Sequence, residues 1–124
     1  MVGSPQEETA DAERREVADG TLVLRTERDG NVHRIELAGE LDLANAATLE
    51  GEVEAILAEP EAQIVIDMRE LEFIDSTGIA LFVAILGRDD TAAPRVRFVL
   101  GASAAVTRVL ELTGLGERLP LAQA

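Results

Sequence analysis

The feature that most restricts the fold is a short apolar run at Ile64–Met68, which lies between two segments with helical periodicity. A strand with apolar residues at successive positions is typically buried on both faces, as in the centre of a parallel sheet. Before the run, apolar residues recur at helical spacing over Ala46–Leu57, with Asp42 or Asn45 as the expected N-cap. After it, Ile79–Leu86 repeats the helical pattern. This alternation predicts parallel strands connected by crossover helices.

The flanking segments extend this α/β pattern. Residues 21–26 and 32–38 have the composition of two strands, joined by a turn at Arg28–Asn31. Alternation at Val96–Leu100 predicts a further strand, and Ser103 can cap a last helix. The predicted order is β-β-α-β-α-β-α, an α/β fold with a mixed, mainly parallel sheet and helices packed on it.

The first twenty residues differ in composition from the rest of the chain. They hold six acidic residues, two arginines and hardly any large apolar side chain. A segment with so little apolar surface cannot offset the conformational entropy lost on ordering. We therefore expect a disordered acidic tail over residues 1–20 and one domain over residues 21–124. Deleting the tail is then expected to leave the melting temperature almost unchanged.

Composition excludes several functional classes. The net charge of −13 argues against nucleic acids and anionic membranes as partners, because both are bound through a surplus of Lys and Arg. The chain has no Cys and no Lys, and His33 is its single histidine. These absences exclude thiolate and His-based metal sites within one chain, catalytic thiols and P-loop lysines. We expect no metal, no cofactor and no enzymatic activity, and we expect His33 to be structural. With neither a signal-peptide pattern nor an apolar stretch of about 18 residues, the expected compartment is the cytoplasm.

The segment before the second helix contains the residues of greatest chemical interest. Leu71–Ile74 is expected to be a connector, and Asp75–Gly78 (Asp-Ser-Thr-Gly) enters the helix. Ser76 is expected to be the N-cap, and a phosphate on it would meet free N–H groups and the positive end of the helix dipole. A catalytic triad with His33 is not supported, because Ser76 is not in a Gly-x-Ser-x-Gly elbow. Asp67 is expected to accept backbone hydrogen bonds at a strand end rather than to form a carboxylate pair with Asp75.

Four short motifs lie in an order and at separations that match a known domain family. They are Gly39–Asp42 (Gly-Glu-Leu-Asp), Ile64–Asp67, Phe73–Gly78 and Arg108–Leu115. Together they resemble the STAS domain, and more closely the bacterial anti-sigma factor antagonists. The resemblance covers about residues 21–121, nearly all of the predicted domain.

The resemblance implies roles for the residues around the serine. Ser76 would be phosphorylated by a partner anti-sigma factor that is a serine kinase, with Asp75 as its acidic neighbour and Asp42 in the turn beside it. Thr77 would complete the helix entry, and Gly78 would allow close approach by the partner's backbone. In this family the unphosphorylated form binds the anti-sigma factor and releases the sigma factor. A separate serine phosphatase resets the system.

Two alternatives within the same family stay open. A STAS module whose serine is not a switch would be an accessory subunit of a transport complex or a scaffold in a signalling assembly. A small-molecule-binding STAS domain is the other alternative, but no Gly-rich phosphate loop supports it. The segment Gly87–Pro94 lacks the basic, helix-extending character common in the family, which bears on the identity of the partner.

Overall fold

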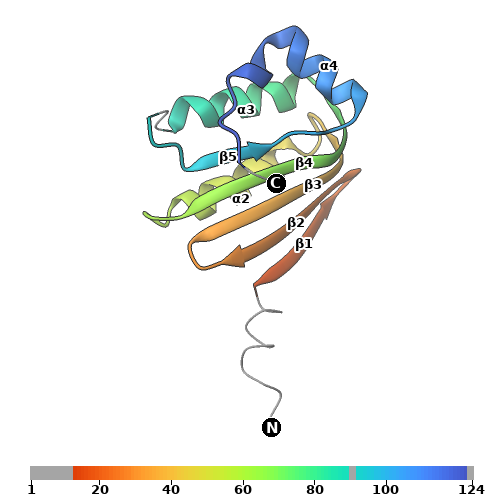
Figure 1. The fold of residues 1–124 in the computed structure, drawn as a ribbon. Coiled ribbons are helices and arrows are strands. Elements are labelled where there is room, and N and C mark those ends of the chain that lie inside the picture. The colour runs from red at the N-terminus through yellow and green to blue at the C-terminus, as the bar shows by residue number, and fades with distance from the viewer. Residues whose placement is uncertain (1–12, 90–91, 123–124) are drawn as a thin grey trace.

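The structure, a computed structural model that describes residues 13–89 and 92–122, is built on a single five-stranded sheet (Figure 1). The strands are β1 (Arg14–Asp19), β2 (Leu22–Asp29), β3 (Val32–Leu41), β4 (Gln63–Ile74) and β5 (Val96–Val99), and the helices are α2 (Ala46–Leu57), α3 (Ser76–Arg88), α4 (Ala104–Thr113) and the short 3-10 helix η1 (Leu115–Glu117). The strand order is β1-β2-β3-β4-β5. The predicted α/β fold is confirmed, with one strand more than expected.

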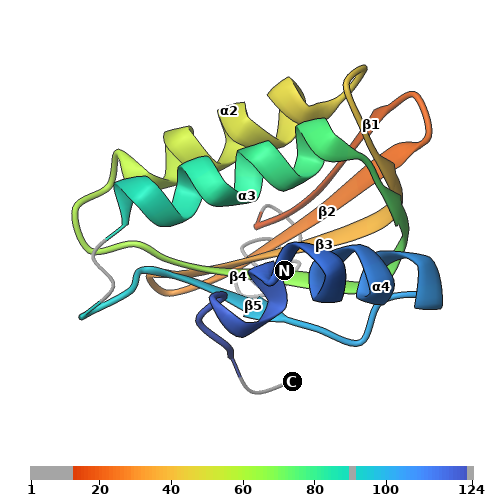
Figure 2. The same ribbon diagram turned by 90° about the horizontal axis from the view of Figure 1, so that it is seen from above.

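Helices cover the two faces of the sheet unequally. β1, β2 and β3 are antiparallel neighbours, whereas β3, β4 and β5 run parallel. Because α2 and α3 are both crossovers between parallel strands, they lie side by side on one face, and α4 lies on the other (Figure 2). The core between the layers is aliphatic, apart from an edge-to-face contact between the Phe82 and Phe98 rings, whose centroids are 5.3 Å apart. No helix in the described part of the chain is long and apolar enough to cross a bilayer.

The prediction of a disordered tail over residues 1–20 is wrong for its second half. Residues 14–19 form β1, which pairs with β2 along its whole length. The predicted start of the domain at residue 21 is therefore too late. Four of the six residues of β1 are charged, so the sequence pattern of a buried strand is absent. The first 12 residues of the predicted tail lie outside the described residues.

Contacts with distant parts of the chain hold β1 in place. Val17 is partly buried against the hydrophobic core. Arg15 forms an ion pair with Glu52 of α2, and the Thr48 hydroxyl of α2 donates a hydrogen bond of 2.5 Å to the Asp19 carboxylate. An edge strand is thus stabilised by backbone pairing and by α2, not by its own apolar content.

Deleting residues 1–20 is therefore expected to destabilise the protein. Loss of the β1–β2 ladder and of the Val17 contact should cost about 1–2 kcal/mol, a fall of roughly 5–10 °C in melting temperature for a domain of this size. Deletion of residues 1–12 is the matched control, measured in the same thermal scan. If both deletions lower the melting temperature equally, β1 contributes nothing to the stability of the domain.

β4 is longer than the sequence pattern indicated. The predicted strand at Ile64–Met68 and the predicted connector at Leu71–Ile74 are one continuous strand. Its pairing with β3 contains two register shifts, which interrupt the alternation of side chains that a sequence pattern detects. As a consequence, β4 ends beside the end of β3 and leads directly into Asp75 and α3.

The ends of the last helix are as predicted. The Ser103 hydroxyl accepts a hydrogen bond of 3.3 Å from the Val106 N–H, and Gly114 ends α4 with a left-handed φ of 71°. After η1, the chain forms an isolated parallel bridge between Leu121 and Phe98 of β5.

Candidate functional site

The candidate site lies where the turn after β3 meets the start of α3. Because β3 and β4 are parallel, both strands end at the same edge of the sheet and the segments that follow them are neighbours (Figure 1). The Asp75 N–H donates a hydrogen bond of 3.1 Å to the Leu41 carbonyl and joins the two segments. The structure thus brings the turn at Asp42 next to Asp75–Gly78, as the resemblance implied.

Asp75, not Ser76, is the N-cap of α3. One carboxylate oxygen of Asp75, Oδ1, accepts hydrogen bonds from the N–H groups of Thr77 (2.8 Å) and Gly78 (3.1 Å). The other, Oδ2, accepts one from the Leu43 N–H at 3.1 Å. The prediction of a Ser76 cap is wrong by one residue, because Asp and Ser are similarly good N-caps and sequence alone does not separate adjacent candidates.

Ser76 is the first residue of α3, and its side chain is exposed. The Thr77 and Gly78 N–H groups, which the sequence predicted to be free for a phosphate, already bind the Asp75 carboxylate. A phosphate on Ser76 would therefore lie beside a carboxylate, at the positive end of the helix dipole. The serine is accessible for modification, but these two amides are not free to bind the phosphate of a phosphorylated Ser76.

The turn at residues 42–45 is held by a closed set of hydrogen bonds. The Asp42 N–H donates to the Asn45 side chain at 2.9 Å, and the Ala44 N–H donates to the Asp42 carboxylate at 3.0 Å. The Asn45 N–H donates to the Asp42 carbonyl at 3.1 Å. The fourth amide of the turn, that of Leu43, donates to Asp75. Asn45 occupies the N-cap position of α2 but makes no side-chain cap bond there, because its side chain serves the turn.

Gly78 is required for packing inside the chain. It is buried, and a Cβ at this position would lie 2.6 Å from Ile74 Cγ1 and 3.1 Å from Leu41 Cδ2. The helix therefore approaches the strand ends more closely than a side chain would allow. Gly78 thus has a packing role inside the chain, and its expected contact with a partner stays a prediction; Thr77 beside it is half-buried.

The surface that continues from Ser76 along α3 consists of small and apolar residues. Ser76, Ala80, Val83 and Gly87 are all exposed and recur at helical spacing on one side of α3. Val83 belongs to the apolar helical pattern over Ile79–Leu86, but its side chain is exposed, since the pattern does not show where the neighbouring helix ends. Side chains this small leave the α3 backbone accessible to a closely packed partner.

The charged residues of the two segments that form the site are all acidic. Within residues 39–45 and 71–78, the charged residues are Glu40, Asp42, Glu72 and Asp75, without a single Arg. A macromolecule that binds here therefore needs a basic surface around its contact area.

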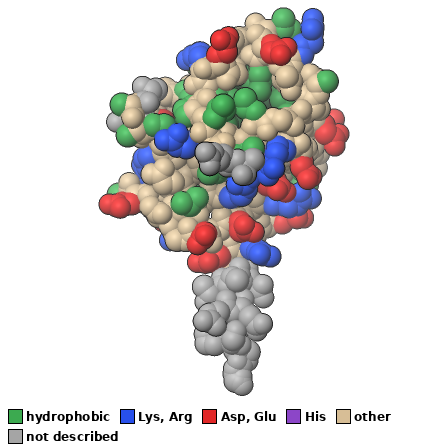
Figure 3. Space-filling model, viewed as in Figure 1, with side chains coloured by type: hydrophobic (Ala, Val, Ile, Leu, Met, Phe, Trp, Pro, Cys, Tyr) green, Lys and Arg blue, Asp and Glu red, His purple; other side chains and the backbone are tan. Residues whose placement is uncertain are grey.

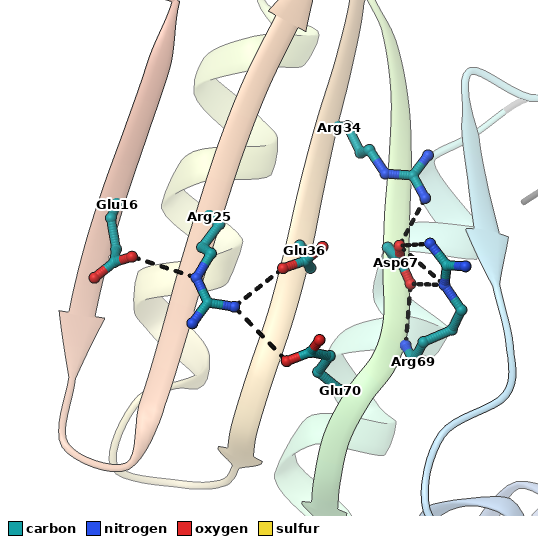
Figure 4. A network of polar contacts seen from close by, with 7 residues as sticks. All are labelled: Glu16, Arg25, Arg34, Glu36, Asp67, Arg69 and Glu70. Atoms are coloured by element: carbon teal, nitrogen blue, oxygen red, sulfur yellow. Dashed lines mark hydrogen bonds and ion pairs between the residues drawn. The ribbon is translucent and has the colours of Figure 1, made fainter. Parts of the chain in front are cut away.

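Asp67 belongs to a different network, on the sheet face opposite α2 and α3 (Figure 4). Its side chain is 1 % exposed and lies in the middle of β4, not at a strand end as predicted. It accepts hydrogen bonds from Arg34 at 2.6 Å and from both the backbone N–H and the side chain of Arg69. Burial raises the pKa of the Asp67 carboxyl, but the hydrogen bonds from Arg69 and Arg34 outweigh it and lower the pKa to about 2.

The part of this face formed by β1, β2 and β3 is also ionic. Arg25 lies between Glu16, Glu36 and Glu70, with its guanidinium 3.0 Å from Glu36 and 3.3 Å from Glu16 (Figure 4). In the space-filling view, charged side chains of both signs lie over the strands, below a group of hydrophobic side chains near α4 (Figure 3). These ion pairs are satisfied within the chain, so Asp67 serves the fold and forms no carboxylate pair with Asp75.

Comparison with known sequences identifies the family to which these features correspond. A family model described as "Mlab, STAS domain" matches residues 24–122. An anti-sigma-B factor antagonist of Staphylococcus aureus is 27% identical over 97 residues, covering 76% of this chain and 86% of the relative. The anti-sigma-F factor antagonist RsfB of Mycobacterium tuberculosis is 31% identical over 104 residues, covering 83% and 82%.

Solved structures give the same correspondence. An anti-sigma factor antagonist from Mycobacterium paratuberculosis superposes with a TM-score of 0.71 at 27% identity, covering 86% of this chain and 90% of that one. The unphosphorylated form of the anti-sigma factor antagonist SpoIIAA superposes with a TM-score of 0.66 at 24% identity, covering 81% and 88%. At 24% identity, the similarity to SpoIIAA shows that the two proteins share a fold. β1 lies before the first residue that the family model matches.

Proposed function

Because the chain belongs to the STAS domain family, we propose that it is an anti-sigma factor antagonist that works by partner switching. Its unphosphorylated form binds an anti-sigma factor that is also a serine kinase, and this binding frees a sigma factor. Phosphorylation of Ser76 ends the binding, and a serine phosphatase restores it. Two relatives named as antagonists of anti-sigma factors, one of them 31% identical, support the general role.

The exposed Ser76 at the start of α3 is the observation that carries the proposal. A kinase must reach the hydroxyl of its substrate, and Ser76 is free to be reached because Asp75 performs the capping. The residues on either side of the serine in the chain, Asp75 and Thr77, are fixed by hydrogen bonds, so the serine is presented on a rigid backbone.

Charge supports a protein partner with a basic surface. The site carries four acidic residues within two short segments, and the whole chain has a net charge of −13. Opposite charge on the partner would speed association and orient the complex. In this proposal the chain is the substrate of its partner and needs no cofactor, no metal and no nucleic acid. We place the exchange in the cytoplasm, where transcription takes place.

The test is phosphorylation by purified serine-kinase anti-sigma factors from the source organism. Each is incubated with the chain and ATP, and the modified residue is located by mass spectrometry. We expect one phosphate, on Ser76, and none on Ser76→Ala; Thr77→Ala is the control that keeps the serine. Binding without phosphorylation would instead favour a non-switching STAS subunit or scaffold. Absence of binding by every kinase would contradict the proposed function itself.

A further inference from the structure

Leu43 is the most exposed of the large hydrophobic residues in the described part of the chain, with 78% of its surface accessible. It lies in the turn that Asp75 joins to the start of α3, directly beside the segment of Ser76. Building on the proposed function, we propose that Leu43 is the apolar anchor of the interface with the anti-sigma factor. Asp75 is then the positioning residue that holds this anchor in place.

Exposure alone does not make a leucine an anchor, since single exposed apolar residues are common on protein surfaces. Leu43 combines its exposure with a place beside the Ser76 segment and with a backbone held by hydrogen bonds. Every N–H of the turn at residues 42–45 has an acceptor, and three of the four acceptors lie within the turn. A side chain presented by an ordered backbone loses less conformational entropy on binding than one in a mobile loop.

Asp75 supplies the one bond that fixes this turn from outside. Its Oδ2 accepts the Leu43 N–H at 3.1 Å, while Oδ1 accepts the two amides of α3. The carboxylate needs both oxygens for these two tasks. An asparagine at this position would have one acceptor oxygen and one NH2 group, so it could not serve both.

The surroundings define the partner surface that fits. Leu43 is flanked in the turn by Asp42, and the nearby strand ends add Glu40 and Glu72. The exposed strip of small residues on α3 begins at Ser76 beside it. The matching partner surface is an apolar pocket with a basic rim, which is complementary both to the leucine and to the acidic residues around it.

Calorimetric titration with the serine-kinase anti-sigma factor that phosphorylates the chain tests the anchor. We expect Leu43→Ala to weaken binding by about 10- to 100-fold, the range of an interface hot spot. Leu112→Ala is the matched control, because Leu112 is 73% exposed and belongs to α4, which lies on the sheet face opposite α2 and α3. It should change the affinity by less than about twofold. Both leucines are exposed, so neither variant should lower the melting temperature.

Asp75→Asn tests the positioning role. We expect faster amide hydrogen exchange at Leu43 and weaker binding by unphosphorylated protein. In the double variant with Leu43→Ala, binding should be no weaker than in Leu43→Ala alone, because Asp75 acts through the leucine. Additive losses would show instead that Asp75 contacts the partner itself and would overturn the positioning role.

The outcomes separate this inference from the function on which it rests. If the unaltered chain binds no serine-kinase anti-sigma factor, the proposed function is wrong. If the unaltered chain binds but Leu43→Ala and Leu112→Ala have equal affinities, the function stands and the Leu43 anchor is refuted.

Discussion

Phosphorylation of Ser76 is expected to weaken binding of the anti-sigma factor by about a hundredfold or more. A phosphoserine carries about −1.5 to −2 charges at neutral pH. It would stand next to the Asp75 carboxylate, whose oxygens already bind the Thr77 and Gly78 amides, so these amides are not available to neutralise it. Like-charge contact inside an interface can cost several kcal/mol, and each 1.4 kcal/mol is about tenfold in affinity.

The fold should survive the modification. Asp75, not Ser76, caps α3, and the serine is exposed, so phosphate removes no internal hydrogen bond of the cap. We expect the melting temperatures of the phosphorylated and unphosphorylated forms to agree within a few degrees. The switch would then act on the interface and leave the domain intact.

Calorimetric titration of four forms checks the switch: unphosphorylated, phosphorylated, Ser76→Ala and Ser76→Asp. Ser76→Ala should bind and resist phosphorylation, which keeps the sigma factor free. Ser76→Asp should bind more weakly than the unaltered chain but better than the phosphorylated form, since a carboxylate carries less charge than a phosphate. Equal affinities of the phosphorylated and unphosphorylated forms would exclude the switch and favour the scaffold alternative.

Replacement of Asp67 by Ala is expected to lower the free energy of unfolding by about 1–3 kcal/mol. The carboxylate is buried and satisfies Arg34 and Arg69, and its loss leaves two guanidinium groups without their shared acceptor. Both arginines are partly exposed, so water compensates part of the loss and the effect stays below that of a fully buried pair. Urea denaturation at neutral pH measures it. Glu27→Ala, which breaks an exposed ion pair with Arg14, is the control and should cost less than about 0.5 kcal/mol.

The same carboxyl predicts a pH dependence. The Asp67 pKa is lowered from an ordinary value of 3.8 to about 2, so folding favours the charged form. The stabilisation is fully present above the unfolded-state pKa and is lost as the pH falls through the window from about 4 to 2. Across this window, the unaltered chain should lose more stability than Asp67→Asn, by about 2 kcal/mol. Parallel stability curves for the two proteins would contradict the lowered pKa.

Local and periodic signals in the sequence were sufficient for the order of elements from β2 onward. The apolar run at Ile64–Met68 identified the central strand, since burial on both faces leaves no polar positions. The stripe of apolar residues identified α2, and Ser103 and Gly114 marked the ends of α4 because cap residues act within one turn of a helix. The Asp-Ser-Thr-Gly motif placed the candidate site at a helix start for the same reason.

What only the tertiary structure decided depends on contacts between residues far apart in the chain. β1 is a strand because β2 and α2 hold it, and its own charged residues argue for a tail. Asp75 is the cap, and Leu43 is held in place, because β3 and β4 end at the same edge of the sheet. Asp67 is held in its charged form by Arg69 of its own strand and by Arg34, which reaches it from the neighbouring strand. Periodicity records which face of an element is buried, but the partner of each polar group is set by strand register and loop packing, which arise when the whole chain folds.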